Sequence, residues 1–410
     1  MDSTLEDLLQ QELVRQQNTL SFIASENYAS QAVIQAQASV ATNKYAEGYP
    51  GKRYYAGCEV VDRIENLAIE RAKELFGVAH ANVQPHAGAM ANLAVFQTLL
   101  SPNDTFLGLS LADGGHLSHG SKVNISGINY QAVTYGVDSK TERLDYSAIQ
   151  QLALTHRPRL IIAGYSAYPA QIDWQAFRQI ADSVGAYLLA DIAHTAGFIA
   201  AGLLPSPQPY ADVITSTTHK SLRGPRGGLM MACRDAALGK KLDKAIFPGV
   251  QGGPMMHTIA AKAQAFYEAL QPDFVDYQRR VLENAQTVAD RFQYHGYALA
   301  SGGTQTHLVL VKLVDITGHA AEQRLAAAHL LVNKNTIPGD TRSPFVTSGI
   351  RIGTPAVTTR GLTKEAVCAM IDGMVALLEQ PDDPMVLERV RQEVIACSMT
   401  YPVYSQGRSW

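Results

Sequence analysis

The sequence contains no apolar run long enough to cross a membrane. Its longest apolar stretch, near Thr195–Leu204, is far shorter than the roughly 18 residues that a membrane-spanning helix requires. The N-terminus also lacks the basic segment that begins a secretory signal, because Asp2, Glu6 and Asp7 stand there instead. These absences argue against a membrane or exported protein, and we expect a cytoplasmic one.

Cysteine is scarce, and neither sign of charge is in large excess. The four cysteines, Cys58, Cys233, Cys368 and Cys397, have none of the paired spacings of a zinc site or a disulfide framework. With 34 basic and 37 acidic side chains the net charge is -3, which disfavours a polyanion-binding surface. We therefore expect a reduced protein that holds no metal and binds no nucleic acid.

Apolar residues, in contrast, are abundant enough for a packed core. Hydrophobic residues make up 46% of the sequence and charged residues 17%. The length of the chain predicts two to three domains, or one large domain with a smaller one. Helical patterning over His257–Leu270 and Asp276–Tyr294 indicates a long connector near a pivot. We expect an N-terminal arm and large domain over residues 1–280, and a smaller α+β domain over residues 281–410.

The middle of the chain predicts a strand–helix–strand unit. The apolar runs Arg159–Ala163 and Ala186–Ala190 flank a segment, Trp174–Val184, whose apolar residues recur every three or four positions. Two further apolar runs, Ala211–Thr215 and Gly228–Ala232, follow as strands. Because buried parallel strands are apolar throughout, we expect an α/β fold with a mostly parallel sheet flanked by helices.

Polar side chains gather where three of these strands end. In an open parallel sheet, ligands bind outside the carboxyl ends of the strands, so these side chains should meet at one edge. They are Ser166, Asp191, His194, Thr217, His219 and Lys220. Each one alone has an ordinary explanation as a cap, a turn residue or a solvated cation, and their joint placement is what indicates a site.

Asp191 and Lys220 indicate the chemistry of that site. A carboxylate buried at a strand end needs a cationic partner, and a protonated pyridine nitrogen is one. A lysine in a partly desolvated pocket has a neutral amine that can form a Schiff base with an aldehyde. The pair predicts a pyridoxal phosphate site, in which the cofactor accepts electrons and the protein selects the bond that breaks.

Two glycine-containing segments are candidates for holding the phosphate. Gly88 precedes an apolar helix whose free N–H groups would bind a phosphate without side-chain help. Gly252 and Gly253, in the segment QGGPMMH, offer a second place of the same kind. A single glycine before a helix is a weak signal, so this prediction depends on the lysine and the aspartate.

Two histidines and an arginine have more than one interpretation. His116 and His119 stand three residues apart, which permits metal binding, but no second ligand cluster accompanies them. An imidazole stacked over a flat cofactor ring is the better alternative. Arg351 lies among small residues in SGIRIGTP, where its guanidinium could bind a carboxylate or make an ordinary ion pair.

These residues lie in tracts that closely resemble one family, the serine hydroxymethyltransferases of the fold type I class of pyridoxal phosphate enzymes. The similar tracts run in unbroken order from about residue 21 to residue 358. They include FIASENY, TNKYAEGYPGKRYYAGCE, DGGHLSHG, ADIAHTAG, TSTTHKSLRGPRGG, FPGVQGGPMMH, LVNKNTIPGD and RSPFVTSGIRIGTPA. The resemblance implies the interconversion of serine and tetrahydrofolate with glycine and 5,10-methylenetetrahydrofolate.

The resemblance also implies a role for each matching residue. Lys220 would form the Schiff base with pyridoxal 5'-phosphate, Asp191 would pair with its ring nitrogen, and His116 would stack on its ring. Further cofactor contacts would come from Gly88, Ala89, Ser166, His194, His219 and Arg226. Thr217 and His219 would join Lys220 and Asp191 among the catalytic residues. Arg351 and Ser25 would hold the carboxylate of the amino acid.

Part of the site is implied to come from a second subunit. The segment Lys44–Gly57 is rich in tyrosine and glycine, and it must lie against something that gives its side chains partners, unless it is simply a surface loop. In the family, the positions matched by Tyr45, Glu47, Tyr55, Gly252 and Gly253 serve the neighbouring subunit. We therefore expect an obligate homodimer, with tetramers left open, and Glu47 as the general acid or base near the substrate hydroxyl and folate.

Two alternatives to this function remain. The positions that line the folate site in the family are matched by Leu111, Gly115, His116, Leu117, Ser343, Pro344 and Phe345. Their presence favours hydroxymethyl transfer over a folate-independent aldolase that cleaves threonine and other β-hydroxy amino acids. A non-catalytic relative would have lost Lys220, Asp191 or Arg351, and all three are present.

One residue departs from the family pattern. The family usually has serine at the position of Ala87, where the hydroxyl helps to hold the phosphate, and the segment here reads HAGAM. Losing one hydrogen bond to a charged group costs roughly 1.5–3 kcal/mol, which is about one to two decades of affinity. We expect weaker retention of the cofactor than in a relative with serine there.

Overall fold

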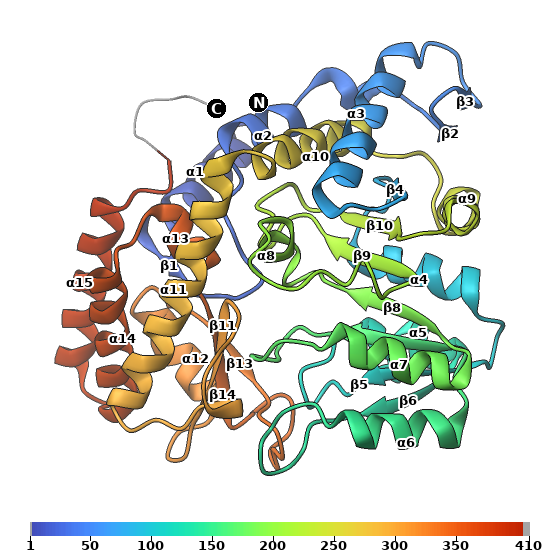
Figure 1. Cartoon of the computed structure of the whole chain (residues 1–410). Helices are drawn as coiled ribbons and strands as arrows, with labels where there is room; N and C mark the ends of the chain where they lie inside the picture. The colour runs from blue at the N-terminus through green and yellow to red at the C-terminus, as the bar shows by residue number, and fades with distance from the viewer. Residues whose placement is uncertain (1, 405–410) are drawn as a thin grey trace. The chain divides into compact units, whose positions relative to one another are not determined.

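The structure is a computed structural model that describes residues 2–404, and it divides into two compact units (Figure 1). The larger unit is Ala29–Arg279, and the smaller unit combines Met1–Tyr28 with Arg280–Trp410. The sequence placed residues 1–28 in the large domain, whereas they pack in the smaller unit. The helical and loop patterning of this segment gives no information about which distant strand it pairs with.

A seven-stranded sheet forms the centre of the larger unit, in the order β4-β10-β9-β8-β7-β5-β6. The strands are β4 (His80–Asn82), β5 (Thr105–Leu109), β6 (Gln131–Tyr135), β7 (Leu160–Gly164), β8 (Tyr187–Asp191), β9 (Val213–Thr217) and β10 (Gly228–Ala232). The neighbours from β9 to β6 all pair in parallel. The predicted α/β fold with a mostly parallel sheet is therefore confirmed.

The last of the predicted parallel strands, β10, runs in the opposite direction. It pairs with β9 antiparallel, with Gly228 opposite Thr217. The prediction was wrong here because a fully buried strand is apolar whichever way it runs. The ten residues between β9 and β10, all of them described, contain no helix. A parallel return needs a crossover of about a dozen residues or more, so the chain turns back directly, and this turn carries His219 and Lys220.

Helices cover the sheet, as Figure 1 shows for α6 and α7. The helices of the larger unit are α2 (Gln31–Gln37), α3 (Glu59–Phe76), α4 (Gly88–Leu99), α5 (Ile125–Asn129), α6 (Tyr146–His156), α7 (Trp174–Val184), α8 (Ala196–Ala200), α9 (Ala236–Lys244) and α10 (Met256–Ala269). Leu160 and Ile162 of β7 share a core with Val95 of α4. As predicted, α7 lies between β7 and β8 in the chain, and it ends at Gly185, whose φ is 70°.

The smaller unit contains a three-stranded antiparallel sheet in the order β11-β14-β13, and a short parallel pair of β1 with β12. These strands are β1 (Leu20–Ser21), β11 (Leu308–Lys312), β12 (Leu330–Leu331), β13 (Asn333–Asn335) and β14 (Gly349–Gly353). Its helices are α1 (Ser3–Asn18), α12 (Gly318–Ala327), α13 (Pro355–Arg360), α14 (Lys364–Glu379) and α15 (Pro384–Thr400), and α11 (Pro272–Tyr294) crosses the boundary between the units. None of the helices that the structure describes is long and apolar enough to cross a membrane.

Arg360 explains why the N-terminal segment belongs to this unit. Its side chain is buried and donates hydrogen bonds to backbone carbonyls from both ends of the chain. The acceptors are Gln16, Gln17 and Thr19 on one side, and Ser398 and Tyr401 on the other. Buried guanidinium groups require such partners, so α1 and α15 are held by the same side chain.

Candidate active site

Four neighbouring strands of the large sheet deliver predicted residues to one edge. Asp191 and Thr217 are the last residues of β8 and β9, and Ser166 lies two residues beyond β7. The loop after β5 carries His116 and leads into a short 3-10 helix, Leu117–His119. Because β9, β8, β7 and β5 are adjacent and parallel, the segments that follow them gather at the same edge.

The Asp191 carboxylate is held by three hydrogen bonds. His119 Nε2 and Asn92 Nδ2 donate to Oδ2 over 2.9 and 2.8 Å, and the Ala193 N–H donates to Oδ1 over 3.1 Å. The side chain is only 9% exposed. Burial raises the pKa of this carboxyl, but the bonds from His119 and Asn92 and the neighbouring imidazoles outweigh it and hold the pKa well below its usual range. Asp191 is therefore a permanent buried anion.

The hydrogen bonds fix the protonation of the two histidines. The Ser118 N–H donates to His116 Nδ1, and the His116 N–H donates to His119 Nδ1. Each Nδ1 is thus an acceptor, which leaves the Nε2–H of His119 to donate to Asp191. Burial lowers the pKa of His116 to about 4, and the Lys220 charge contributes to this against the opposing effect of Asp191. His116 is a neutral ring at neutral pH.

The turn between β9 and β10 carries the lysine. Lys220 is 8% exposed, and its positive charge contributes to lowering the pKa values of both His116 and His219. Burial, together with the charges of Arg226 and Lys220, lowers the pKa of His219 to about 3. Within the described residues, His219 Nδ1 is buried without a hydrogen-bond partner. The turn therefore presents an amine and an unsatisfied imidazole nitrogen together.

The residues that line this edge from the other loops are closely packed. Ser166 donates from Oγ to the Gly115 carbonyl over 2.7 Å, and the Thr217 hydroxyl donates to the Ala193 carbonyl over 3.2 Å. His194 is 3% exposed. The structure therefore brings Ser166, His194 and Thr217 to the same strand ends as Asp191.

The start of α4 faces this edge. The N–H groups of Met90 and Ala91 donate to the Ala87 carbonyl, which leaves the N–H groups of Gly88 and Ala89 ahead of the helix's own hydrogen bonds. A Cβ added to Gly88 would lie 2.8 Å from Thr217 Cγ2. Glycine is therefore needed for the helix to start this close to β9, and its free N–H groups form a place for an anion.

A second group of predicted residues is exposed. We define the loop cluster as Tyr45, Glu47 and Tyr55, on the segment that contains the hairpin of β2 (Gly48–Tyr49) and β3 (Lys52–Arg53). The Tyr45 hydroxyl donates to Glu47 Oε1 over 3.1 Å, and the two tyrosine rings meet edge to face at 4.9 Å. Tyr45 is 54% and Tyr55 is 47% exposed.

Gly252 and Gly253 lie beside the loop cluster. A Cβ on Gly252 would be 3.4 Å from Glu47 Oε1, and one on Gly253 would be 3.3 Å from the Tyr45 ring. The preceding residue, Gln251, accepts the His86 N–H at 2.9 Å. The two glycines therefore lie beside the exposed tyrosines, and Gln251 links their segment to the residues just before α4.

In the smaller unit, the segment that precedes Ser25 packs on the end of the strand that carries Arg351. Arg351, on β14, is 9% exposed and donates from Nε to Asn333 Oδ1 over 2.9 Å. Burial lowers its pKa to about 10. The segment before Ser25 packs on the end of β14, because the Gly353 N–H donates to the Phe22 carbonyl and Ala24 fills the space beside Gly353. A buried guanidinium is a group suited to binding a carboxylate ligand.

The predicted folate positions are mostly exposed. Leu111 and Leu117 are 47% and 45% exposed on the larger unit, and Phe345 is 81% exposed on the smaller one. Ser343 and Pro344 lie in the same loop as Phe345, and the Asp340 carboxylate holds that loop through Ser348. Each unit therefore leaves apolar side chains in water at its own predicted positions.

Comparison with known proteins identifies the family. The family model for serine hydroxymethyltransferase matches residues 1–374. The chain is 56% identical over 406 residues to the serine hydroxymethyltransferase of Methylococcus capsulatus, covering 98% of this chain and 97% of that one. It is 55% identical over 406 residues to the enzyme of Legionella pneumophila, covering 98% of this chain and 97% of that one. It is also 55% identical over 408 residues to the enzyme of Alkalilimnicola ehrlichii, covering 99% of this chain and 97% of that one. The chain belongs to the serine hydroxymethyltransferase family.

Membership of the serine hydroxymethyltransferase family supports hydroxymethyl transfer and not the folate-independent aldolase. The enzymes of this family use pyridoxal phosphate, with tetrahydrofolate as cosubstrate. The residues at the strand ends fit that cofactor: a buried carboxylate, a buried lysine, an unsatisfied His219 nitrogen and the open N–H groups of α4 occupy one edge of the sheet.

Two residues of the serine hydroxymethyltransferase site were missed in the sequence. Asn92 is a lone polar residue on an otherwise apolar face of α4, and it bridges Asp191 and Ser118. His119 donates to Asp191, a role that neither metal binding nor stacking on a cofactor ring predicts. Among the described residues, no cluster of three or more histidine, cysteine and acidic side chains could hold a metal ion. A polar residue inside an apolar helix pattern was the signal that could have identified Asn92.

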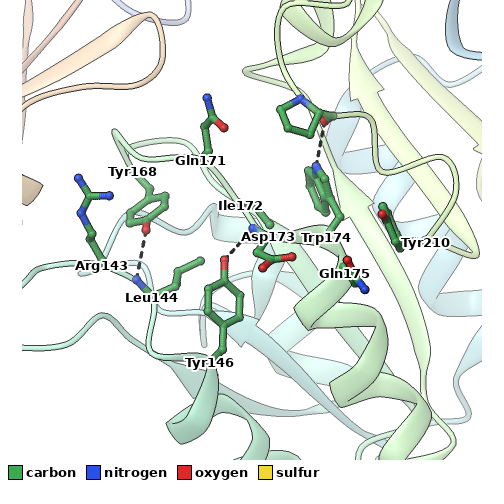
Figure 2. A pocket seen from close by; sticks show the side chains of 11 residues that line it. Arg143, Leu144, Tyr146, Tyr168, Gln171, Ile172, Asp173, Trp174, Gln175 and Tyr210 are labelled. Carbon is green, nitrogen blue, oxygen red and sulfur yellow. Dashed lines mark hydrogen bonds between the residues drawn. The ribbon is translucent and has the colours of Figure 1, made fainter.

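A separate pocket of about 430 Å³ lies elsewhere on the larger unit (Figure 2). None of the residues that line it is a predicted site residue. The Tyr146 hydroxyl accepts the Asp173 N–H, the Tyr168 hydroxyl accepts the Leu144 N–H, and Trp174 donates to the Pro205 carbonyl. Its polar groups thus hold the backbone before α6 and at the start of α7.

Proposed function

We propose that the strand-end residues around Asp191 and Lys220 bind and activate pyridoxal phosphate for hydroxymethyl transfer between serine and glycine. The observation that carries this proposal is the permanent anion at Asp191, which His119 and Asn92 hold in place. Asp191 and Lys220 both act electrostatically on His116. When bound, the cofactor supplies a cationic ring that accepts the electron pair of the breaking bond.

Asp191 would hold a proton on the ring nitrogen of the cofactor. Its pKa lies well below the usual range, so it stays ionised and stabilises the positive charge beside it. His119 and Asn92 prevent the carboxylate from turning away or taking up the proton itself. His116, neutral at its pKa of about 4, is suited to cover the ring because it adds no competing charge.

Lys220 and the start of α4 would hold the two remaining ends of the cofactor. The Lys220 amine provides the covalent attachment, and the N–H groups of Gly88 and Ala89 bind the phosphate with His219. In this chain Ala87 provides no hydroxyl there, so backbone groups carry more of the binding.

Arg351 would bind the carboxylate of serine or glycine, with Ser25. A guanidinium fork fixes a carboxylate through two parallel hydrogen bonds, and this fixes the rotation of the substrate about its Cα. The bond that breaks must stand perpendicular to the cofactor ring, so Arg351 selects the Cα–Cβ bond by orientation.

Glu47 would transfer the proton at the substrate hydroxyl and folate, as an acid or base supplied by a second copy of the chain. The exposure of Tyr45 and Tyr55 supports a homodimer in which another subunit covers the loop cluster. The four free cysteines, two of them buried, support a reducing cytoplasmic location.

The test is serine cleavage by the purified holoenzyme with and without tetrahydrofolate, followed by a spectrum of the enzyme with glycine and reduced folate. We expect cleavage that depends on folate, and a change in the visible spectrum only when both ligands are present. Cleavage at the same rate without folate would contradict the proposal and favour the aldolase.

A further inference from the structure

Lys262 is a fully buried lysine that the mechanism above does not use. It lies in the middle of α10 and is 1% exposed. Its amine donates to three backbone carbonyls, Val83 at 2.6 Å, Gly228 at 2.8 Å and Pro85 at 3.0 Å. An ammonium has three N–H donors, so every one of them is used by backbone.

The three carbonyls belong to the two segments that flank the proposed phosphate position. Val83 and Pro85 lead into His86, Ala87 and Gly88 at the start of α4, and Gly228 begins β10 directly after the turn with Arg226. The Gly228 N–H also donates to the Pro85 carbonyl. Lys262 therefore joins the segment before α4 to the end of the lysine-bearing turn.

The packing around the amine leaves no space for adjustment. A Cβ on Gly227 would lie 2.5 Å from Lys262 Cε, and one on Gly228 would lie 2.4 Å from the Ala87 carbonyl oxygen. Glycine at both positions lets the turn approach the amine and the start of α4 at once. Lys262 thus packs against the turn at the point where Gly228 approaches Ala87.

The charge of Lys262 faces the same place. All three of its hydrogen-bond acceptors are neutral, and the acid that acts on it, Glu65, is itself paired with Arg53. Burial lowers the pKa of the amine to about 7. Burial lowers the pKa values of His86 and His219, which border the start of α4 and the turn, and the charge of Lys262 adds to both effects. A buried cation in these surroundings is stabilised by a nearby anion.

We propose that Lys262 is a positioning residue for the cofactor phosphate: it fixes the segment 83–88 against the turn 226–228, which together flank the proposed phosphate position, and its amine, when protonated, adds a buried positive charge near that position. This inference rests on the proposed function, because it takes the start of α4 as the phosphate position. Part of the affinity for the phosphate would thus depend on a residue that does not contact the ligand.

The experiment compares two probes, pyridoxal 5'-phosphate and pyridoxal, on the protein freed of cofactor. We expect Lys262→Met to weaken binding of the phosphorylated probe about tenfold or more and to leave binding of pyridoxal nearly unchanged. Equal losses for both probes would assign Lys262 a merely structural role and overturn the proposal, as would no loss for either. Failure of the wild type to bind the phosphorylated probe would instead overturn the proposed function.

Arg71→Met is the matched control. Arg71 is also a cation that donates to a backbone carbonyl of α10, that of Ala263, but it lies over the Tyr267 ring and away from the start of α4. We expect it to lower the melting temperature without changing the ratio of the two dissociation constants. A change in that ratio equal to that of Lys262→Met would overturn the proposal.

A measurement on the wild type keeps the test decisive if Lys262→Met does not fold. Amide hydrogen exchange of cofactor-free protein is followed with and without inorganic phosphate. We expect phosphate to slow exchange in residues 83–90 and 226–230 together, because one amine joins them. Slowing confined to one segment would contradict the coupling.

Discussion

The two parts of the candidate site in the larger unit are prepared in different ways. The strand-end part contains a buried carboxylate whose bonds to His119, Asn92 and Ala193 are all made within one chain. The loop cluster instead has its two tyrosines about half exposed, with one internal hydrogen bond between Tyr45 and Glu47. A charge that must be buried is satisfied before any ligand binds, whereas the loop cluster, for which we propose a covering second subunit, leaves its tyrosines in water.

The side chains of the loop cluster are exposed, but buried hydrogen bonds hold the hairpin that follows Tyr45 and Glu47 in the chain. Arg53, next to these residues in the hairpin, donates to Glu65, Asp62 and the carbonyls of Ala46 and Gly48. Gln84 donates both to Glu65 and to the Gly48 carbonyl. The exposed side chains therefore stand on a buried polar network, which is what a group presented to a neighbouring subunit requires.

The largest expected effect comes from the strand-end part. Lys220→Ala removes the amine that attaches the cofactor, and we expect serine turnover to fall by about a thousandfold or more, because this nucleophile has no substitute. The measurement is turnover together with the visible spectrum of the holoenzyme. Lys244→Ala, an exposed lysine of α9, serves as the control and should retain both. An unchanged, exchangeable absorbance in Lys220→Ala would exclude Lys220.

A smaller effect is expected in the loop cluster. Glu47→Gln removes the group that moves the proton, so folate-dependent turnover should fall about a hundredfold or more, while cofactor affinity stays the same. Glu74→Gln, in α3, is the control. Near-normal turnover would remove Glu47 from the mechanism.

Mixing these two variants tests directly whether the parts come from different subunits. Alone, chains with Lys220→Ala and chains with Glu47→Gln should each retain about a hundredth of wild-type turnover or less. Co-expressed in equal amounts, they should recover about a quarter of wild-type turnover, because half of the dimers contain one intact site of two. Turnover no higher than that of either variant alone would show that each chain uses its own Glu47.

A still smaller effect is expected at the start of α4. Ala87→Ser places a hydroxyl at the N-cap of the helix, which has no side-chain cap in this chain. We expect the dissociation constant of pyridoxal phosphate to fall about ten- to a hundredfold. Ala148→Ser, in the first turn of α6, is the control. An unchanged dissociation constant would mean that backbone groups already satisfy the phosphate.

The smallest effect is in the pH dependence of stability. The pKa values of His116 and His219 lie at about 4 and about 3, below the ordinary value. Below about pH 6.5 these two histidines therefore take up protons in the unfolded chain but stay neutral in the folded chain. As the pH falls, the free energy of unfolding decreases by at most about 1.4 kcal/mol per pH unit for each histidine.

Urea denaturation of the cofactor-free protein between pH 7 and pH 5 measures this slope. His219→Asn should make it shallower, whereas Glu47→Gln should leave it unchanged, since the loop cluster contains no histidine. The same slope in His219→Asn as in the wild type would contradict the assignment of a buried neutral imidazole.

The strand-end part was more predictable from sequence than the rest. Apolar runs that end in Asp191 and Thr217 specify both the strands and the edge where the side chains meet. The direction of β10 was not predictable, because its apolar sequence suits either direction and only the length of the connection decides it. The strands β13 and β14 were not predicted from the sequence. β13 is short and polar, and its position in the sheet depends on pairing with β14, in which Asn333 lies opposite Arg351.

Long-range polar contacts were the least predictable feature. His119 and Asp191 are 72 residues apart, and Asn92 lies 99 residues from the same carboxylate. A residue pattern with a period of two or 3.6 carries no information on such a contact. The same is true of Lys262, whose spacing in α10 is that of any buried helical position.

Arg360 carries a practical consequence for handling the protein. This guanidinium donates hydrogen bonds to main-chain oxygens at the ends of both α1 and α15. Removing either helix would therefore remove acceptors that the other helix cannot replace. A protease nick before Thr19 should consequently loosen the last helix, and a deletion of that helix should fray the first.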